Sequence, residues 1–161
     1  MTNMTIAGGR SDARFRAGSA ALIVLALTCI HHAYGAAAFD TPWRLHIILF
    51  AVPAAIIIVT LLYLAGAYRH ETRGRLALWA AALIILAFPV AMIGFYEGGY
   101  NHLIKNIVFF VGGEDTARSL FPAPTYEMPN DTIFEVTGIA QFPLSVLTTV
   151  MTIAMLRETR R

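Results

Sequence analysis

Four long apolar runs alternate with shorter polar stretches along the chain. They cover residues 17–39, 45–68, 76–96 and 133–156, and none of them contains Lys or Arg. A helix needs roughly 20 residues to cross a bilayer, and inside the bilayer the backbone must satisfy its hydrogen bonds internally. The pattern therefore predicts an all-α membrane protein, with four transmembrane helices in a bundle and residues 1–161 forming a single membrane domain.

The segment between the third and fourth runs, residues 97–132, is long for a connection in a helix bundle. Within residues 101–111 the apolar positions recur at helical spacing and the polar ones take the other face. Glycine pairs stand before and after this stretch. We expect a short amphipathic helix over residues 101–111 that lies in the outer membrane interface. The alternative is a straight continuation of the third helix above the membrane.

The third run contains two local features that affect its geometry. Pro89 lies inside it and removes one backbone hydrogen bond, which predicts a distortion of the helix. Gly94 and Gly98 stand four residues apart, a spacing that permits the close approach of another helix.

Composition agrees with a membrane protein. Hydrophobic residues make up 57% of the chain and charged residues only 14%, whereas a soluble domain has about 25% charged residues. The single cysteine, Cys29, excludes an internal disulfide and a CxxC redox pair. These figures argue against a disordered chain, a disulfide scaffold and an ordinary soluble enzyme, and they make the lipid bilayer the first expected partner.

The basic residues are sorted along the chain. Three precede the first run, three lie between the second and third runs, and three follow the fourth, whereas only Arg44, Lys105 and Arg118 lie in the opposite segments. By the positive-inside rule both termini are expected to be cytoplasmic, in a bacterial inner (plasma) membrane. Because topology alone explains the basic residues, the net charge of +2 gives no reason to expect a nucleic-acid partner.

One competing interpretation concerns the first run. Basic residues at 10–16, an apolar stretch at 20–30 and the alanines at 36–38 resemble a secretory signal with a cleavage site. Cleavage would leave three helices and remove His31 and His32. The run stays apolar through Ala38, which favours a retained helix.

Polar residues at membrane depth are the main functional hints, because each is costly there. His31 and His32 lie roughly 11 Å inside the outer boundary, and Gln141 lies at a similar depth. The outermost turns of the second, third and fourth helices carry His46, Glu97 and Glu135, and the outer loop above them carries His102 and Glu127. All four helices thus supply polar groups to the outer half, whereas the inner half supplies only hydroxyl groups.

Each of these residues also has an ordinary structural explanation. His31 and His32 must be neutral and partnered, and since neighbours on a helix point about 100° apart, they are expected to do different jobs. One of them can hydrogen-bond Gln141 between helices. Glu135 fits a capping box that begins at Thr132. For His46 and His102, simple contact with water is the ordinary explanation.

The functional hypothesis is that the outer half binds a metal ion, a redox cofactor or a small ligand. The candidate metal ligands are His31, His32, Glu97, His102 and Glu135, a set that suits Zn, Fe or Mn. Glu97 and His102 stand five residues apart, which is a poor fit to one face of an α-helix. Haem held by two histidines is a second version, and its candidate ligands are His31, His32, His46 and His102.

Two other classes remain open. The chain fits a noncatalytic membrane subunit or partner-binding module, either as a homo-oligomer or beside another membrane subunit. It fits a transporter or channel less well, because the inner half lacks the ionisable groups of a continuous path. Neither a nucleophile elbow nor a phosphate-binding loop is present, and the sequence leaves open whether the protein is an enzyme.

Overall fold

The computed structural model describes residues 6–159, and the side chains of residues 13–158. Its main helices are α1 (Ile6–Ala38), α2 (His46–Ala67), α3 (Thr72–Ile85), η2 (Leu86–Ile104), α4 (Lys105–Gly112), α5 (Glu114–Leu120) and α6 (Thr132–Thr159). A short 3-10 turn, η1 (Pro42–Leu45), joins α1 to α2. Every regular element in this part of the chain is helical.

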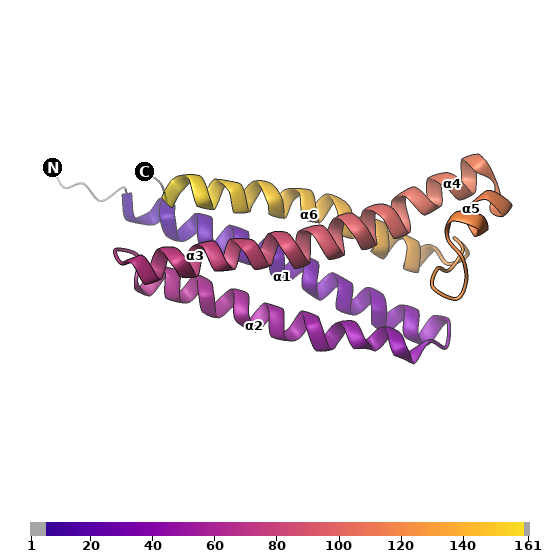
Figure 1. Ribbon diagram of the computed structural model, residues 1–161, viewed down its shortest axis with the longest axis horizontal. Helices are drawn as coiled ribbons and strands as arrows, with labels where there is room; N and C mark the ends of the chain where they lie inside the picture. Colours follow the sequence, from indigo (N-terminus) through magenta and orange to yellow (C-terminus); the bar gives the residue numbers. More distant parts are fainter. Residues whose placement is uncertain (1–5, 160–161) are drawn as a thin grey trace.

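The helices form an elongated bundle (Figure 1). Helix α1 begins and α6 ends at one end of the bundle, while α4 and α5 lie at the other (Figure 1). Four helical stretches are long and apolar enough to span a membrane: Ala13–Ala38, Pro42–Ala67, Thr72–Gly112 and Thr132–Glu158. The prediction of four such helices is confirmed.

The third helix is much longer than predicted. Helices α3, η2 and α4 follow one another without a break from Thr72 to Gly112. The prediction of a separate interfacial helix at residues 101–111 is therefore wrong. These residues continue the third helix. The first glycine pair packs instead of breaking the helix: a Cβ at Gly98 would lie 2.8 Å from the backbone nitrogen of Phe142 in α6. Only the second pair ends the helix, at Gly113 with a φ of +86°.

Within this long helix, η2 is a π-helix, in which hydrogen bonds join residues five apart. The change begins directly after Ile85. Ile85 stands four residues before Pro89, whose ring would collide with the Ile85 carbonyl group in a regular α-helix. The distortion expected at Pro89 thus takes the form of a wider helix.

Small residues let the helices approach closely at the end where α1 begins. The cluster there contains Ala13, Ala17, Ala65, Ala77, Leu78, Ala82 and Met155. In the middle of the bundle larger side chains, such as Val24, Ile58, Ile85 and Ile93, fill the core. Helix η2 packs closely against α6 at Gly94, where the absence of a side chain permits the contact. A Cβ at Gly94 would lie only 1.9 Å from the Cβ of Ser145. The expected close contact at Gly94 and Gly98 is confirmed.

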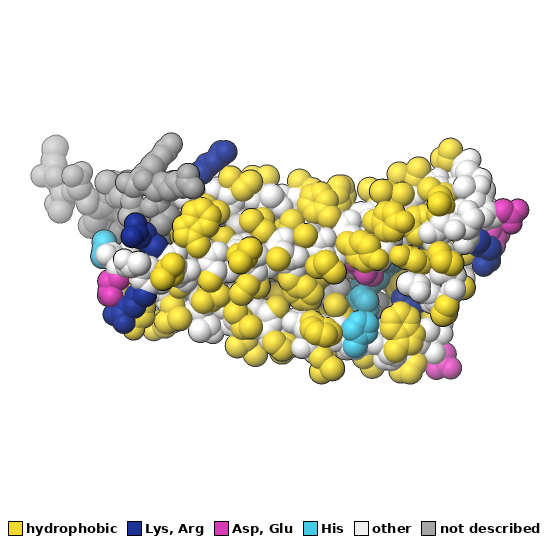
Figure 2. Space-filling view, viewed as in Figure 1, with side chains coloured by type: hydrophobic (Ala, Val, Ile, Leu, Met, Phe, Trp, Pro, Cys, Tyr) yellow, Lys and Arg dark blue, Asp and Glu magenta, His cyan; other side chains and the backbone are white. Residues whose placement is uncertain are grey.

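Charged side chains gather toward the two ends of the bundle, and apolar side chains cover its middle (Figure 2). Lys and Arg side chains are conspicuous at the end where α1 begins (Figure 2). Toward the other end, histidine and acidic side chains show on the face between the helices (Figure 2). The Lys and Arg side chains at the end where α1 begins agree with the expected sorting of basic residues. The orientation of the termini across a membrane remains a prediction.

Candidate metal centre

Three histidines approach one glutamate in the half of the bundle remote from the termini. The Nε2 atoms of His31 and His32 in α1 lie 3.8 and 3.4 Å from Oε1 of Glu97 in η2. The Nε2 atom of His102, further along η2, lies 3.7 Å from the same oxygen. His31 and His32 were expected to do different jobs, yet both rings present Nε2 to one carboxylate oxygen.

Glu97 and His102 can share this site because η2 is a π-helix. Residues five apart point in different directions on an α-helix. In a helix with hydrogen bonds from i to i+5, they lie one turn apart on similar faces. The expectation that Glu97 and His102 fit poorly on one helix face is therefore wrong. It assumed an α-helix, and the spacing alone does not reveal that this segment is a π-helix.

His102 is held by a second glutamate. Its Nδ1 atom lies 2.9 Å from Oε2 of Glu135 in α6, and both residues are buried. A carboxylate can only accept, so Nδ1 donates its proton to Glu135. When the ring is neutral, its lone pair then stands on Nε2, the atom that faces Glu97.

Glu135 is itself fixed by two further side chains. Lys105, which is 1% exposed, lies with its Nζ 2.7 Å from Oε1 of Glu135. Asn106 donates from its amide group to Oε2. Both follow His102 at i+3 and i+4, so they come from the same side of the helix. These contacts pair the buried charges of Lys105 and Glu135 and hold the carboxylate against His102.

His31 is oriented in the same way by a hydroxyl group. Its Nδ1 atom lies 3.0 Å from Oγ1 of Thr137 in α6. The Thr137 hydroxyl directs its own proton at the carbonyl groups of Ile133 and Phe134, at 2.7 and 3.1 Å. Its oxygen must therefore accept from Nδ1, and the lone pair of His31 stands on Nε2.

The ligand atoms of His31, Glu97 and His102 all lie within 4.8 Å of one another, so this group could hold a metal ion. The rings of His31 and His102 meet edge to face, with their centroids 4.7 Å apart. His32 adds a third imidazole at the same glutamate oxygen. Two of the histidines carry the partner on the far ring nitrogen that orients histidine ligands in many metal sites.

His46 lies at the edge of this group. Its ring centroid is 6.4 Å from that of His32, but its Nδ1 atom contacts the backbone oxygen of Trp43 at 2.5 Å. The ring also stacks on Trp43 and is exposed. The structure thus brings His31, His32, Glu97, His102 and Glu135 together, and it leaves His46 beside them.

Three structural explanations offered for these residues are wrong, and the first is contact of His102 with water, because that side chain is buried. His31 bonds Thr137, and the Gln141 side-chain amide has no hydrogen-bond partner. The cap of α6 is Asp131, whose Oδ1 accepts from the backbone N–H of Phe134 at 2.8 Å. Glu135 is consequently free to turn inward toward His102. The role of Thr137 was missed, because a hydroxyl in an apolar helix commonly bonds only its own backbone.

The loop after α5 lies over the site and is tied to it by charged residues. Lys105 donates from Nζ to the backbone oxygen of Glu127. The Glu127 carboxylate lies 3.0 Å from Nη2 of Arg44, which is buried among aromatic rings. A hydrogen bond to Tyr96 raises the pKa of Tyr126 in this loop to about 12. The loop therefore excludes water from the Lys105–Glu135 pair.

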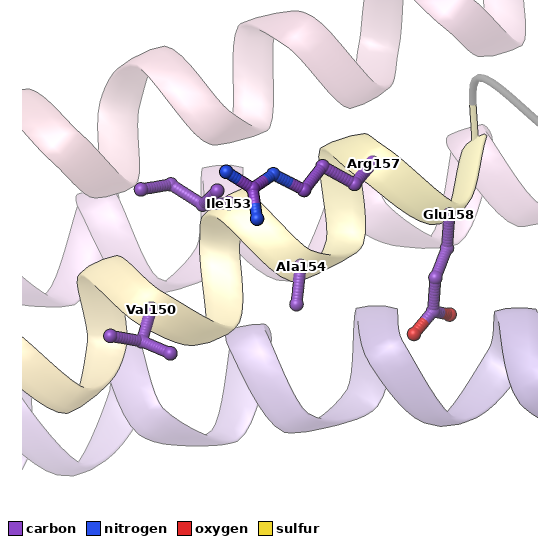
Figure 3. A pocket seen from close by; sticks show the side chains of 5 residues that line it. All are labelled: Val150, Ile153, Ala154, Arg157 and Glu158. Carbon is purple, nitrogen blue, oxygen red and sulfur yellow. The ribbon is translucent and has the colours of Figure 1, made fainter.

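Two surface grooves lie away from this cluster, toward the opposite end of the bundle. One, of about 390 Å³, runs along α6, where Val150, Ala154 and Glu158 point toward α1 (Figure 3). Glu158 is paired there with Arg16 at 3.6 Å. The other, of about 210 Å³, has an almost wholly apolar lining between α1 and α6. Neither groove presents a set of metal ligands among the residues that line it.

The donor set at the cluster is imidazole and carboxylate without thiolate. Such a set suits Zn, Fe(II) or Mn, and two histidines with one carboxylate are typical of non-haem iron sites that keep coordination positions open. The chain was compared with models of protein families, with curated proteins and with solved structures, and none of them matches it.

Proposed function

We propose that this chain is a membrane protein that holds a divalent metal ion between His31, Glu97 and His102. The observation that carries the proposal is the orientation of the two imidazole rings. Thr137 and Glu135 take the Nδ1 protons of His31 and His102, which leaves both Nε2 lone pairs directed at one oxygen of Glu97. Imidazoles that served only to join helices would need no common focus.

The spacing of the donor atoms supports the same conclusion. Ligand atoms 2.0–2.2 Å from a tetrahedral ion lie about 3.4 Å from one another. The three Nε2 atoms lie 3.4 to 3.8 Å from Oε1 of Glu97. An ion can thus be accommodated between His31, Glu97 and His102 with small movements of the side chains, and His32 lies beside this set.

The contact between His31 and His102 argues against haem at this pair. A haem iron with two axial histidines needs the porphyrin plane between the rings. The two rings already touch edge to face with centroids 4.7 Å apart, which leaves no space for a macrocycle. A single ion fits the arrangement better.

Metal analysis of the full-length protein, purified in mild detergent, tests the proposal. We expect about one Zn, Fe or Mn per chain, or stoichiometric uptake of added Co(II), and loss of the metal in His31→Ala, His102→Ala and Glu97→Gln. His70→Ala is the matched control, because His70 is exposed at the opposite end of α2. Absence of binding in the wild type, or equal loss in His70→Ala, would overturn the proposal. A Soret band in the absorption spectrum would favour haem instead.

A further inference from the structure

Buried polar atoms without a hydrogen-bond partner are concentrated around the proposed metal site. Among the side chains described, such atoms belong to only five residues: Thr28, His31, His32, Asn101 and Gln141. The Nε2 atoms of His31 and His32 face Glu97, and Asn101 donates to Glu97 through its other side-chain atom at 3.5 Å, while Nδ1 of His32 belongs to a ring of the cluster itself. Thr28 and Gln141, both fully buried, are left without any such explanation.

Gln141 lies one turn deeper in the bundle than the metal-binding cluster. It follows Thr137, the partner of His31, by four residues, and it follows Gly138 by three. A Cβ at Gly138 would lie 2.4 Å from the ring of His102. A Cβ at Gly98 would lie 3.0 Å from the Cβ of Gln141. These contacts place Gln141 on the inner side of the His102 ring, beside η2.

Thr28 approaches the same level from α1. It precedes His31 by three residues, which is about 4.5 Å along a helix. Helices α1 and α6 run in opposite directions along the bundle (Figure 1), so one turn before His31 and one turn after Thr137 lie at the same depth. Thr28 and Gln141 therefore lie one turn inward of the cluster, on two different helices.

The hydroxyl of Thr28 is unlike the other buried hydroxyls. Ser145, Thr148 and Thr152 each donate to a backbone carbonyl group three or four residues earlier, at 2.7 to 2.8 Å. Thr28 makes no such bond. A fully buried hydroxyl and a fully buried amide without partners destabilise the fold unless they have a ligand to bind.

We propose that Thr28 and Gln141 bind a small polar molecule on the inner side of the metal ion, where it completes the coordination shell. This inference rests on the proposed function and adds a ligand class to it. A hydroxyl and an amide both donate and accept hydrogen bonds and carry no charge. They suit water or a small anion of a few atoms. Three protein ligands and one exchangeable molecule are the arrangement of metal sites that act on a bound substrate.

Azide binding to the Co(II)-loaded protein tests the inference, because azide ligates metals and accepts hydrogen bonds. We expect azide to change the visible Co(II) spectrum of the wild type with a saturable dependence on concentration. Gln141→Met and Thr28→Val should each weaken azide binding about tenfold, as expected for the loss of a buried hydrogen bond, with the Co(II) stoichiometry unchanged. Thr148→Val is the matched control, since that hydroxyl bonds only the backbone.

The outcomes separate this inference from the proposed function. Failure of the wild type to bind Co(II) overturns both. Co(II) binding without a spectral response to azide overturns the inference alone, as does equal azide affinity in Thr28→Val and Thr148→Val. The comparison of Thr28→Val with Thr148→Val decides the matter even where Gln141→Met fails to fold.

Discussion

Nδ1 of His102 and Oε2 of Glu135 lie 2.9 Å apart in the interior of the bundle, although 33 residues separate them in the chain. The contact joins η2 to α6 and fixes which nitrogen of His102 faces Glu97. The contact between His31 and Thr137 does the same from α1. Two ligands from different helices are thus oriented by residues of a third helix, and this dependence can be tested.

Replacing Thr137 by Val removes the acceptor for the Nδ1 proton of His31. The ring then leaves Nδ1–H unsatisfied, or moves the proton to Nε2 and loses its lone pair toward Glu97. Loss of such a supporting contact typically weakens metal binding about 10- to 100-fold. Competition titrations with a chromophoric chelator should show this loss in Thr137→Val.

Thr149→Val provides the control for this substitution. The Thr149 hydroxyl donates to the carbonyl group of Ser145 at 2.8 Å and touches none of the proposed ligands. Equal metal affinities in the two variants would mean that His31 needs no orienting partner.

The buried pair of Lys105 and Glu135 predicts a strong coupling in stability. Removing one partner of a buried ion pair costs about 3–5 kcal/mol, because the other charge is left uncompensated. We therefore expect Lys105→Met and Glu135→Gln each to lower the free energy of unfolding by about this amount. The double variant should lose much less than the sum, since it buries no unpaired charge.

Unfolding of the four proteins in detergent measures this coupling, and strict additivity would contradict it. The same set isolates the effect of Glu135 on the metal. Relative to Lys105→Met, the double variant lacks the carboxylate that accepts from His102, so it should bind metal about 10- to 100-fold more weakly.

The four long helices could be predicted from the sequence, because a bilayer leaves little choice of backbone structure. Runs without Lys or Arg predict spanning helices, and the structure has four helices that are long and apolar enough to span a membrane. The length of the third helix could not be predicted from the apolar runs. Gly98 and Gly99 have the composition of a helix end, but their lack of side chains is used for packing against Phe142. Packing decided between two functions of glycine that local sequence does not distinguish.

The candidate site was predictable as a set of residue types and not as a set of contacts. Polar residues at membrane depth predicted the participation of His31 and His32 in a buried cluster. The partners came out differently, because Thr137 and not Gln141 contacts His31. The proximity of Glu97 and His102 depends on the π-helix. Such contacts depend on helix rotation and pitch, which spacing along an ideal α-helix misses.

Gly138→Ala should displace a proposed ligand without changing its chemistry. The added methyl group would lie 2.4 Å from the ring of His102, closer than any ordinary contact. We expect the free energy of unfolding to fall by about 1–3 kcal/mol, as is typical of overpacking, and metal affinity to fall with it. Gly112→Ala is the control, because its methyl group would meet Thr116 at 3.5 Å, an ordinary contact. Unaltered metal affinity in Gly138→Ala would place His102 outside the site.

The start of α6 should make stability depend on pH through Asp131. The backbone N–H of Phe134 and the hydroxyl of Tyr34 both donate to its carboxylate, at 2.8 Å each, and these bonds hold the pKa of Asp131 below its usual value. Since the folded state favours the charged form of Asp131, the resulting stabilisation is complete above the unfolded pKa of about 3.9. It is lost as the pH falls through the pKa of Asp131 in the folded state.

Asparagine at this position keeps an acceptor for the cap but carries no charge. The difference in Tm between the wild type and Asp131→Asn should therefore be positive near pH 6 and shrink toward pH 3, whereas Asp131→Ala, which also loses the cap, should lie below Asp131→Asn throughout. A difference that stayed constant or grew on acidification would show that the charge on Asp131 does not stabilise the helix.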